Sequence, residues 1–129
     1  GRYSVEEIKD LDKYAVSKGV ELIPCIQTLA HLESMFKWYD RYDDINDCDD
    51  VLLIDNEKTY RLIEDMISTV AECFSSRKIH IGMDEAYRVG AGKYKKEHGE
   101  KDKFDIINAH LHKVCGILKK YNLNMKSEK

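Results

Sequence analysis

The order of helical and strand-like segments is the feature that most constrains the fold of this chain. Apolar residues recur at helical spacing in three segments, and two short apolar runs between them have the character of buried strands. The predicted helices cover residues 4–19, 57–74 and 104–121, and the predicted strands cover 20–27 and 78–84. Strands that alternate with helices pair in parallel, because each helix returns the chain to the same end of the sheet. We therefore expect one α/β segment over residues 1–129.

The connections between these elements differ in length. The helix-to-strand connections, at Gly19 and near residues 75–78, are only a few residues long. The strand-to-helix connections are long, spanning roughly 27–56, with a short helix expected at 32–38, and 86–103. Because both long loops leave the same edge of a parallel sheet, we expect them to meet there. In β/α barrels this edge carries the active site.

The segment is too short for a complete barrel. A (β/α)8 TIM barrel needs about 250 residues and eight strands, and this chain has 129 residues. A further strand is expected just after the last helix, near Asn124. We interpret the chain as part of such a barrel, with a small three-layer α/β domain as the alternative. Because it starts at Gly1 rather than Met, we expect it to be cut from something longer.

Composition excludes several function classes. The net charge of −3 and the pI of about 6.0 do not favour nucleic-acid binding. No apolar run approaches the ~20 residues that a membrane span requires. The cysteines have neither metal-type nor redox-type spacing, so we expect reduced thiols, a cytoplasmic location and no metal or cofactor. They are Cys25, Cys48, Cys73 and Cys115.

Three local patterns do not match the binding sites that they resemble. The acidic run "DRYDDINDCDD" at 40–50 lacks the glycine and final glutamate of an EF-hand, which favours a solvated loop. The run "GAGK" at 90–93 lacks the upstream glycine of a phosphate-binding loop, where Tyr87 stands. His110 and His112 lie on different helix faces, so they make a poor metal pair.

Two adjacent carboxylates, Asp84 and Glu85, stand where the second predicted strand ends. Alternation along that strand places Asp84 on the face of Gly82, which leaves space beside the backbone. Neighbouring carboxylates repel when both are ionised, so one of them can keep its proton near neutral pH. Such a pair suits the cleavage of glycosidic bonds. The alternative is an ordinary solvated pair that caps the loop.

Two segments of the sequence resemble glycoside hydrolase family 20, the β-N-acetylhexosaminidases, and most of all its bacterial members. "IHIGMDEA" at 79–86 resembles the H-x-G-x-D-E signature of the family, and "ELIPCIQTLAHL" at 21–32 resembles the strand and loop that precede it. The resemblance extends to "HLHKV" in the last helix. It implies an exo-acting enzyme that removes β-linked N-acetylglucosamine or N-acetylgalactosamine from glycans by a substrate-assisted, retaining mechanism.

The resemblance also implies roles for individual residues. Glu85 would be the general acid and base, Asp84 would bind the acetamido group of the substrate, and His31 would lie near Glu85. Many relatives have an acid at the position of Gln27. The amide of Gln27 would contribute a hydrogen bond there but no charge. Many relatives also have Gly-Gly where this chain has Gly82 and Met83. His80 is expected to be a packed structural histidine.

A second hypothesis is a non-catalytic outcome for the isolated chain. Two strands leave open sheet edges and apolar helix faces, so we expect self-association and little or no activity from these residues alone. In that case the chain would be a truncated half-barrel that assembles or binds sugar weakly. A phosphate-binding α/β domain is a third class, disfavoured by the incomplete glycine loop.

Overall fold

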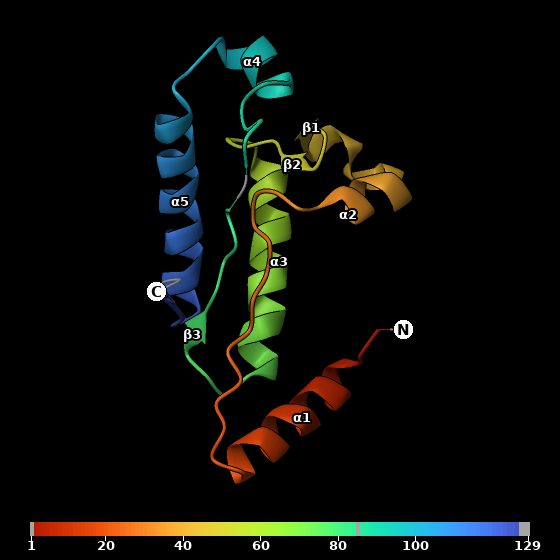
Figure 1. The fold of residues 1–129 in the computed structure, drawn as a ribbon, viewed down its shortest axis with the longest axis vertical. Coiled ribbons are helices and arrows are strands. Elements are labelled where there is room, and N and C mark those ends of the chain that lie inside the picture. The colour runs from red at the N-terminus through yellow and green to blue at the C-terminus, as the bar shows by residue number, and fades with distance from the viewer. Residues whose placement is uncertain (1, 85, 127–129) are drawn as a thin grey trace.

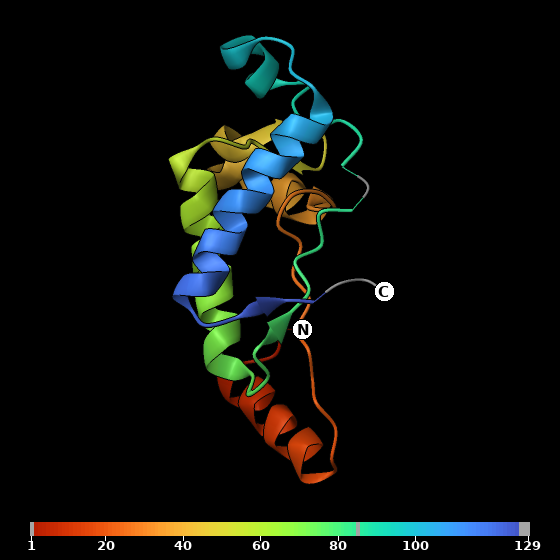
Figure 2. The same cartoon turned by 90° about the vertical axis from the view of Figure 1, so that its left-hand side faces the viewer.

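The structure, a computed structural model, describes residues 2–84 and 86–126. Helices α3 and α5 lie side by side and form one layer, and extended segments form a second layer against them (Figures 1 and 2). The elements in chain order are α1 (Val5–Ser17), α2 (Glu33–Trp38), the 3-10 helix η1 (Asp40–Ile45), β1 (Asn46–Cys48), β2 (Val51–Leu52), α3 (Glu57–Cys73), β3 (Lys78–Ile79), α4 (Lys93–His98), α5 (Lys103–Lys120) and β4 (Asn124–Met125).

Three extended segments lie in parallel. β3 pairs with β4, which adds one strand to the two predicted and lies after the last helix, where another strand would be expected. On the other side of β3, a parallel bridge joins Cys25 to His80. The Ile26 N–H donates to the His80 carbonyl at 2.9 Å, and the Thr28 N–H donates to the Ile81 carbonyl at 3.1 Å.

Both predicted strands are shorter than expected. The first pairs only around Cys25, and residues 20–23 carry no strand. The second was predicted to reach Asp84, but Gly82 and Met83 have φ angles of +74° and +69°. A left-handed backbone cannot continue the ladder of a strand. The pleat therefore ends at Ile81, and the chain turns sharply just before the candidate carboxylates.

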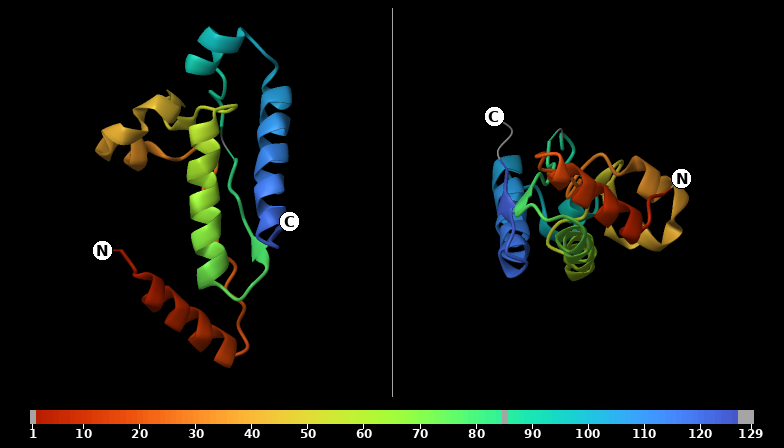
Figure 3. Two further views of the ribbon diagram at one scale, coloured as in Figure 1. Left: turned by 180° about the vertical axis from the view of Figure 1, so that it is seen from behind. Right: turned by 90° about the horizontal axis from the view of Figure 1, so that it is seen from below.

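The first helix begins with the predicted capping box. The Ser4 hydroxyl accepts from the Glu7 N–H at 3.1 Å, and the Glu7 carboxylate accepts from the Ser4 N–H at 3.2 Å. Its expected apolar face is nevertheless mostly exposed, because α1 packs on the described residues only along a narrow line around Asp12 and Ala15. Figure 3 shows α1 lying obliquely below the α3 and α5 pair.

The main core lies between the two long helices and the extended segments. Ile63 and Ile67 of α3 are fully buried, as their helical spacing predicted. The apolar spacing of α5 predicts a buried stripe of Phe104, Ile107, Leu111, Val114 and Leu118. Val114 and Leu118 are buried as predicted, but Phe104 is 70% exposed, and Ile106 and His110 are buried in the first half of the helix. His110 can occupy this face because both of its ring nitrogens have hydrogen-bond partners.

The two long loops contain more structure than the sequence predicted. Helix α2 was expected, but η1, the β1–β2 hairpin and α4 were not. A second apolar cluster packs these loops together beyond the ends of the extended segments. Its buried members are Leu29, Ala30, Val51, Ile54, Ala86, Val89 and Ile106. The loops are therefore a packed layer at the carboxyl edge of the sheet.

Candidate active site

The predicted site residues meet where the two long loops leave the extended segments. Nε2 of His31 lies 3.6 Å from Oδ2 of Asp84, although the two residues are far apart in the sequence. Both side chains are partly exposed, at 37% and 45%. The expected meeting of the two loops is confirmed. Glu85, the predicted acid and base, lies outside the described residues.

The backbone on both sides of this contact is unusual. His31 has a φ of +61° and Met83, next to Asp84, has a φ of +69°. Non-glycine residues rarely adopt these angles, and such strain persists only where surrounding contacts impose it. Met83 packs against both apolar clusters, which holds its conformation.

Gln27 and Gly82 are in close contact beside the site. A Cβ atom at Gly82 would lie 2.3 Å from Oε1 of Gln27, so only glycine fits. Oε1 of Gln27 is buried and has no hydrogen-bond partner among the residues that the structure describes. Gln27 thus packs directly against the turn at Gly82.

His80 precedes Gly82 by two residues, and its ring contacts the turn at Gly82. Its Nδ1 atom accepts a hydrogen bond from the Gly82 N–H at 3.2 Å and lies 3.4 Å from the sulfur of Cys25. An Nδ1 that accepts from an amide carries no proton itself, so the neutral ring is protonated on Nε2. His80 thereby ties the turn at Gly82 to the neighbouring segment, as expected for a structural histidine.

His110 is a buried residue of the site region that sequence reasoning missed. Its Nε2 donates to the Thr28 carbonyl at 2.8 Å, and its Nδ1 accepts from the Tyr60 hydroxyl at 3.0 Å. Burial lowers the pKa of His110 to about 4 and raises that of Tyr60 to about 12. The spacing of His110 from Ile106 and Val114 is the signal that could have revealed its burial.

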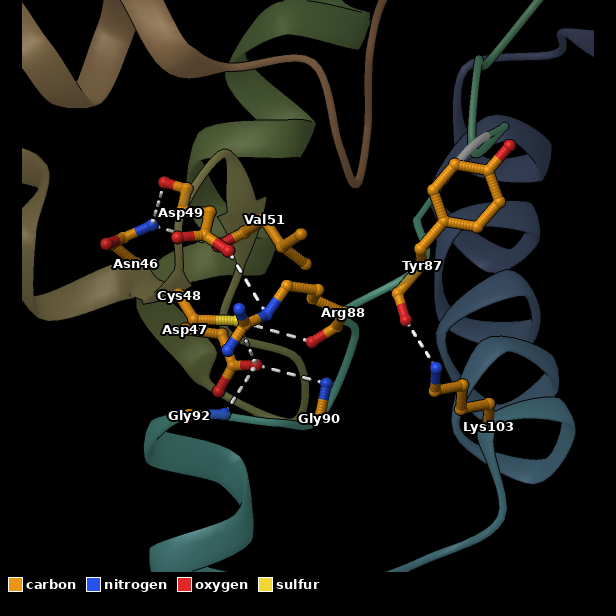
Figure 4. Close-up of polar contacts among 10 residues, drawn as sticks. All are labelled: Asn46, Asp47, Cys48, Asp49, Val51, Tyr87, Arg88, Gly90, Gly92 and Lys103. Carbon is orange, nitrogen blue, oxygen red and sulfur yellow. Dashed lines mark hydrogen bonds and ion pairs between the residues drawn. The ribbon is translucent and has the colours of Figure 1, made fainter.

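The acidic run is not the fully solvated loop that the sequence predicted. Asp47 is 6% exposed, and its carboxylate accepts from the N–H groups of Gly90, Gly92 and Tyr94. Figure 4 shows the contacts with Gly90 and Gly92. Backbone N–H groups in and beside the run "GAGK" therefore bind a carboxylate, and this carboxylate is the Asp47 side chain of the chain itself. Exposed members of the run, such as Asp44 paired with Lys58, agree with the prediction.

Three further observations on the described residues concern metal binding, membrane spans and a groove. Within residues 2–84 and 86–126, no cluster of three or more His, Cys, Asp or Glu side chains has the arrangement of a metal site. No helix in the same ranges is long and apolar enough to cross a membrane. A groove of about 550 Å³ opens between α3 and α5 and is lined by Tyr60, Lys113 and Gly116 among others, but by none of the predicted site residues.

Comparisons with known proteins give a consistent picture. Residues 1–127 match the glycosyl hydrolase family 20 catalytic domain. A β-hexosaminidase of Vibrio furnissii is 33% identical over 96 residues, which are 66% of this chain and 16% of that protein. Hexosaminidase D of Bos taurus is 30% identical over 127 residues, 91% of this chain and 36% of that protein. The chain thus spans well under half the length of these relatives.

Solved structures have the same fold over almost all of this chain. The N-acetyl-β-hexosaminidase of Streptomyces plicatus, in complex with Thio-NAglucal, superposes with a TM-score of 0.72 at 27% identity. That match covers 97% of this chain and 24% of the other. The exo-β-N-acetylglucosaminidase of Vibrio harveyi, in complex with N-acetylglucosamine, gives a TM-score of 0.81 at 22% identity, covering 97% and 22%.

Proposed function

This chain belongs to glycosyl hydrolase family 20, and from that premise we propose that the full-length protein is an exo-β-N-acetylhexosaminidase. Its substrates would be glycans that end in β-linked N-acetylglucosamine or N-acetylgalactosamine. The observation that carries the proposal is the meeting of His31 and Asp84, 3.6 Å apart, at the carboxyl edge of a parallel sheet. Active sites of β/α barrels lie at this edge.

The proposed mechanism is retaining and uses a nucleophile from the substrate. The oxygen of the 2-acetamido group attacks the anomeric carbon while Glu85 gives its proton to the departing glycosidic oxygen. The products of this step are the free leaving group and a cyclic oxazolinium ion. Water then attacks the anomeric carbon and transfers a proton to Glu85. This attack opens the oxazolinium ring and restores the original configuration at the anomeric carbon.

Asp84 has a separate role in this proposal. Its carboxylate would accept a hydrogen bond from the acetamido N–H and stabilise the positive charge that develops on the oxazolinium ring. The side chain of His31 is in contact with this carboxylate and would fix its orientation. The adjacency of Asp84 and Glu85 allows one strand end to serve both the internal nucleophile and the leaving group.

A comparison of two substrates tests the proposal. The full-length protein should hydrolyse 4-nitrophenyl N-acetyl-β-D-glucosaminide or galactosaminide. The matching β-D-glucoside or galactoside, which has a hydroxyl in place of the acetamido group, should not react, because it lacks the nucleophile. Equal hydrolysis of both types would contradict substrate assistance. Hydrolysis of neither would contradict the proposed activity.

A second candidate concerns the 129 residues taken alone, which we propose are inactive and self-associate. Among the described residues β4 pairs only with β3, so one strand edge is open. Leu11 and Tyr14 of α1 are also exposed, at 53% and 62%. These features support an assembling half-barrel as the behaviour of the isolated segment; weak sugar binding is the alternative role of such a half-barrel.

A further inference from the structure

The β1–β2 hairpin contacts both loops that carry the predicted site residues. On one side, the buried carboxylate of Asp47 accepts three backbone hydrogen bonds from the loop that follows Asp84. The donors are Tyr94 at 2.7 Å, Gly90 at 3.0 Å and Gly92 at 3.4 Å. Figure 4 shows the N–H groups of Gly90 and Gly92 converging on the Asp47 side chain. Hydrogen bonds to an ionised acceptor are stronger than neutral ones.

The fit between the hairpin and this loop is close. A Cβ atom at Gly92 would lie 2.0 Å from the Asp47 carbonyl oxygen, so the approach requires glycine. The thiol of Cys48 donates to the Arg88 carbonyl at 3.2 Å. Burial raises the pKa of this thiol, so it remains a neutral donor. The loop is therefore held at several points along its backbone.

On its other side the hairpin holds the loop of His31. Oδ2 of Asp50 accepts from the His31 N–H at 2.9 Å, and the Asp50 carbonyl accepts from the Leu32 N–H at 3.2 Å. The Leu52 N–H donates to the Leu29 carbonyl at 2.8 Å. These bonds fix the backbone on both sides of His31 and at His31 itself, where the chain is left-handed. Asp50 thus holds a conformation that is unfavourable by itself.

We propose that the β1–β2 hairpin is a clasp that keeps the two loops of the site in register, with Asp47 and Asp50 as positioning residues. Asp47 sets the path of the chain after Asp84 and Glu85, and Asp50 sets the position of His31. This inference rests on the proposed function for its catalytic consequence. A misplacement of about 1 Å in such a site can lower turnover by about a hundredfold.

The test compares three carboxylate-to-amide variants of the full-length protein. Asp47→Asn and Asp50→Asn alter the clasp. Asp49→Asn is the control. The exposed side chain of Asp49 also reaches the loop, through the exposed Arg88 at 3.2 Å, but an ion pair on the surface contributes little, so the control separates this pair from the buried contacts of Asp47. Turnover is measured on a nitrophenyl and on a methyl N-acetyl-β-glucosaminide. The methyl leaving group depends on the acid, whereas nitrophenolate leaves readily without it.

Asp47→Asn and Asp50→Asn should lower turnover at least tenfold on the methyl glycoside and distinctly less on the nitrophenyl glycoside, with Asp49→Asn within twofold of wild type. A protein that is only destabilised would lose the same fraction of activity on both substrates. An unchanged ratio between the two substrates in Asp47→Asn and Asp50→Asn would overturn the positioning role.

Amide hydrogen exchange gives a readout that is independent of activity. In Asp47→Asn the amides of residues 90–94 should exchange at least tenfold faster than in wild type and in Asp49→Asn. Unchanged exchange would overturn the clasp itself. If the wild-type protein hydrolyses neither substrate, the proposed function fails, and the exchange comparison still decides whether Asp47 holds the loop.

Discussion

The ring of His110 in α5 holds the carbonyl oxygen of Thr28 at 2.8 Å, three residues before His31 in the chain. The hydroxyl of Thr28 in turn donates to the Ile81 carbonyl at 2.7 Å, just before the turn that leads to Asp84. The helix layer is therefore connected through buried hydrogen bonds to both loops of the site. Because of this connection, removal of His110 should destabilise the folded protein.

Replacement of His110 by alanine should lower the free energy of unfolding by about 2–4 kcal/mol. The change leaves the Thr28 carbonyl and the Tyr60 hydroxyl without their partner and opens a cavity. Urea denaturation of the full-length protein measures the effect. His112→Ala is the matched control, because His112 is exposed on the same helix and should change stability by less than about 0.5 kcal/mol. Equal effects of the two changes would contradict this account.

Stability should also fall with acidification because of His110. Its pKa is about 4 in the folded protein and 6.5 ordinarily, so the unfolded chain binds the additional proton between these values. The contribution of His110 to stability is complete above pH 6.5 and is lost as pH falls toward 4, by on the order of 3 kcal/mol. His110→Gln should flatten this part of the curve of stability against pH. A curve parallel to wild type would show that His110 does not titrate in this way.

Gly82→Ala should be more damaging than Gly19→Ala. Both glycines have a φ near +75°, so the backbone strain of about 1–2 kcal/mol is common to the two changes. A Cβ at Gly19 meets nothing within 4 Å, whereas one at Gly82 would overlap Oε1 of Gln27. The midpoint of urea unfolding should fall further for Gly82→Ala, and Gln27→Ala added to it should restore part of the loss. Indistinguishable midpoints for the two single variants would refute the contact.

Residues 1–129 expressed alone should form oligomers or a partly molten state. Within residues 2–84 and 86–126, one edge of β4 is open and apolar side chains of α1 are exposed, which is the physical reason. Light scattering combined with thermal unfolding tests this expectation. A monomer with one cooperative transition would contradict it.

The sequence predicted features that depend on near neighbours. The capping box at Ser4 and the buried stripe of α3 follow from spacings of three and four residues, and both are present. The prediction for α5 was wrong only in its first half, where Ile106 and His110 are buried and Phe104 is exposed. The burial of His110 depends on hydrogen bonds with Thr28 and Tyr60, which are distant in sequence. The roles of Asp47 and Asp50 were missed for the same reason. Their partners lie in other loops, and an acidic run shows no periodicity that separates buried from solvated carboxylates.

We propose that Asp84 and Glu85 carry out the chemistry of the full-length protein, and turnover of their amide variants tests this proposal most directly. In the full-length protein, Glu85→Gln should lower turnover of a methyl N-acetyl-β-glucosaminide by about a hundredfold or more, and Asp84→Asn by about tenfold or more. Glu100→Gln, an exposed carboxylate outside the site, is the matched control. Wild-type rates in both site variants would contradict the account.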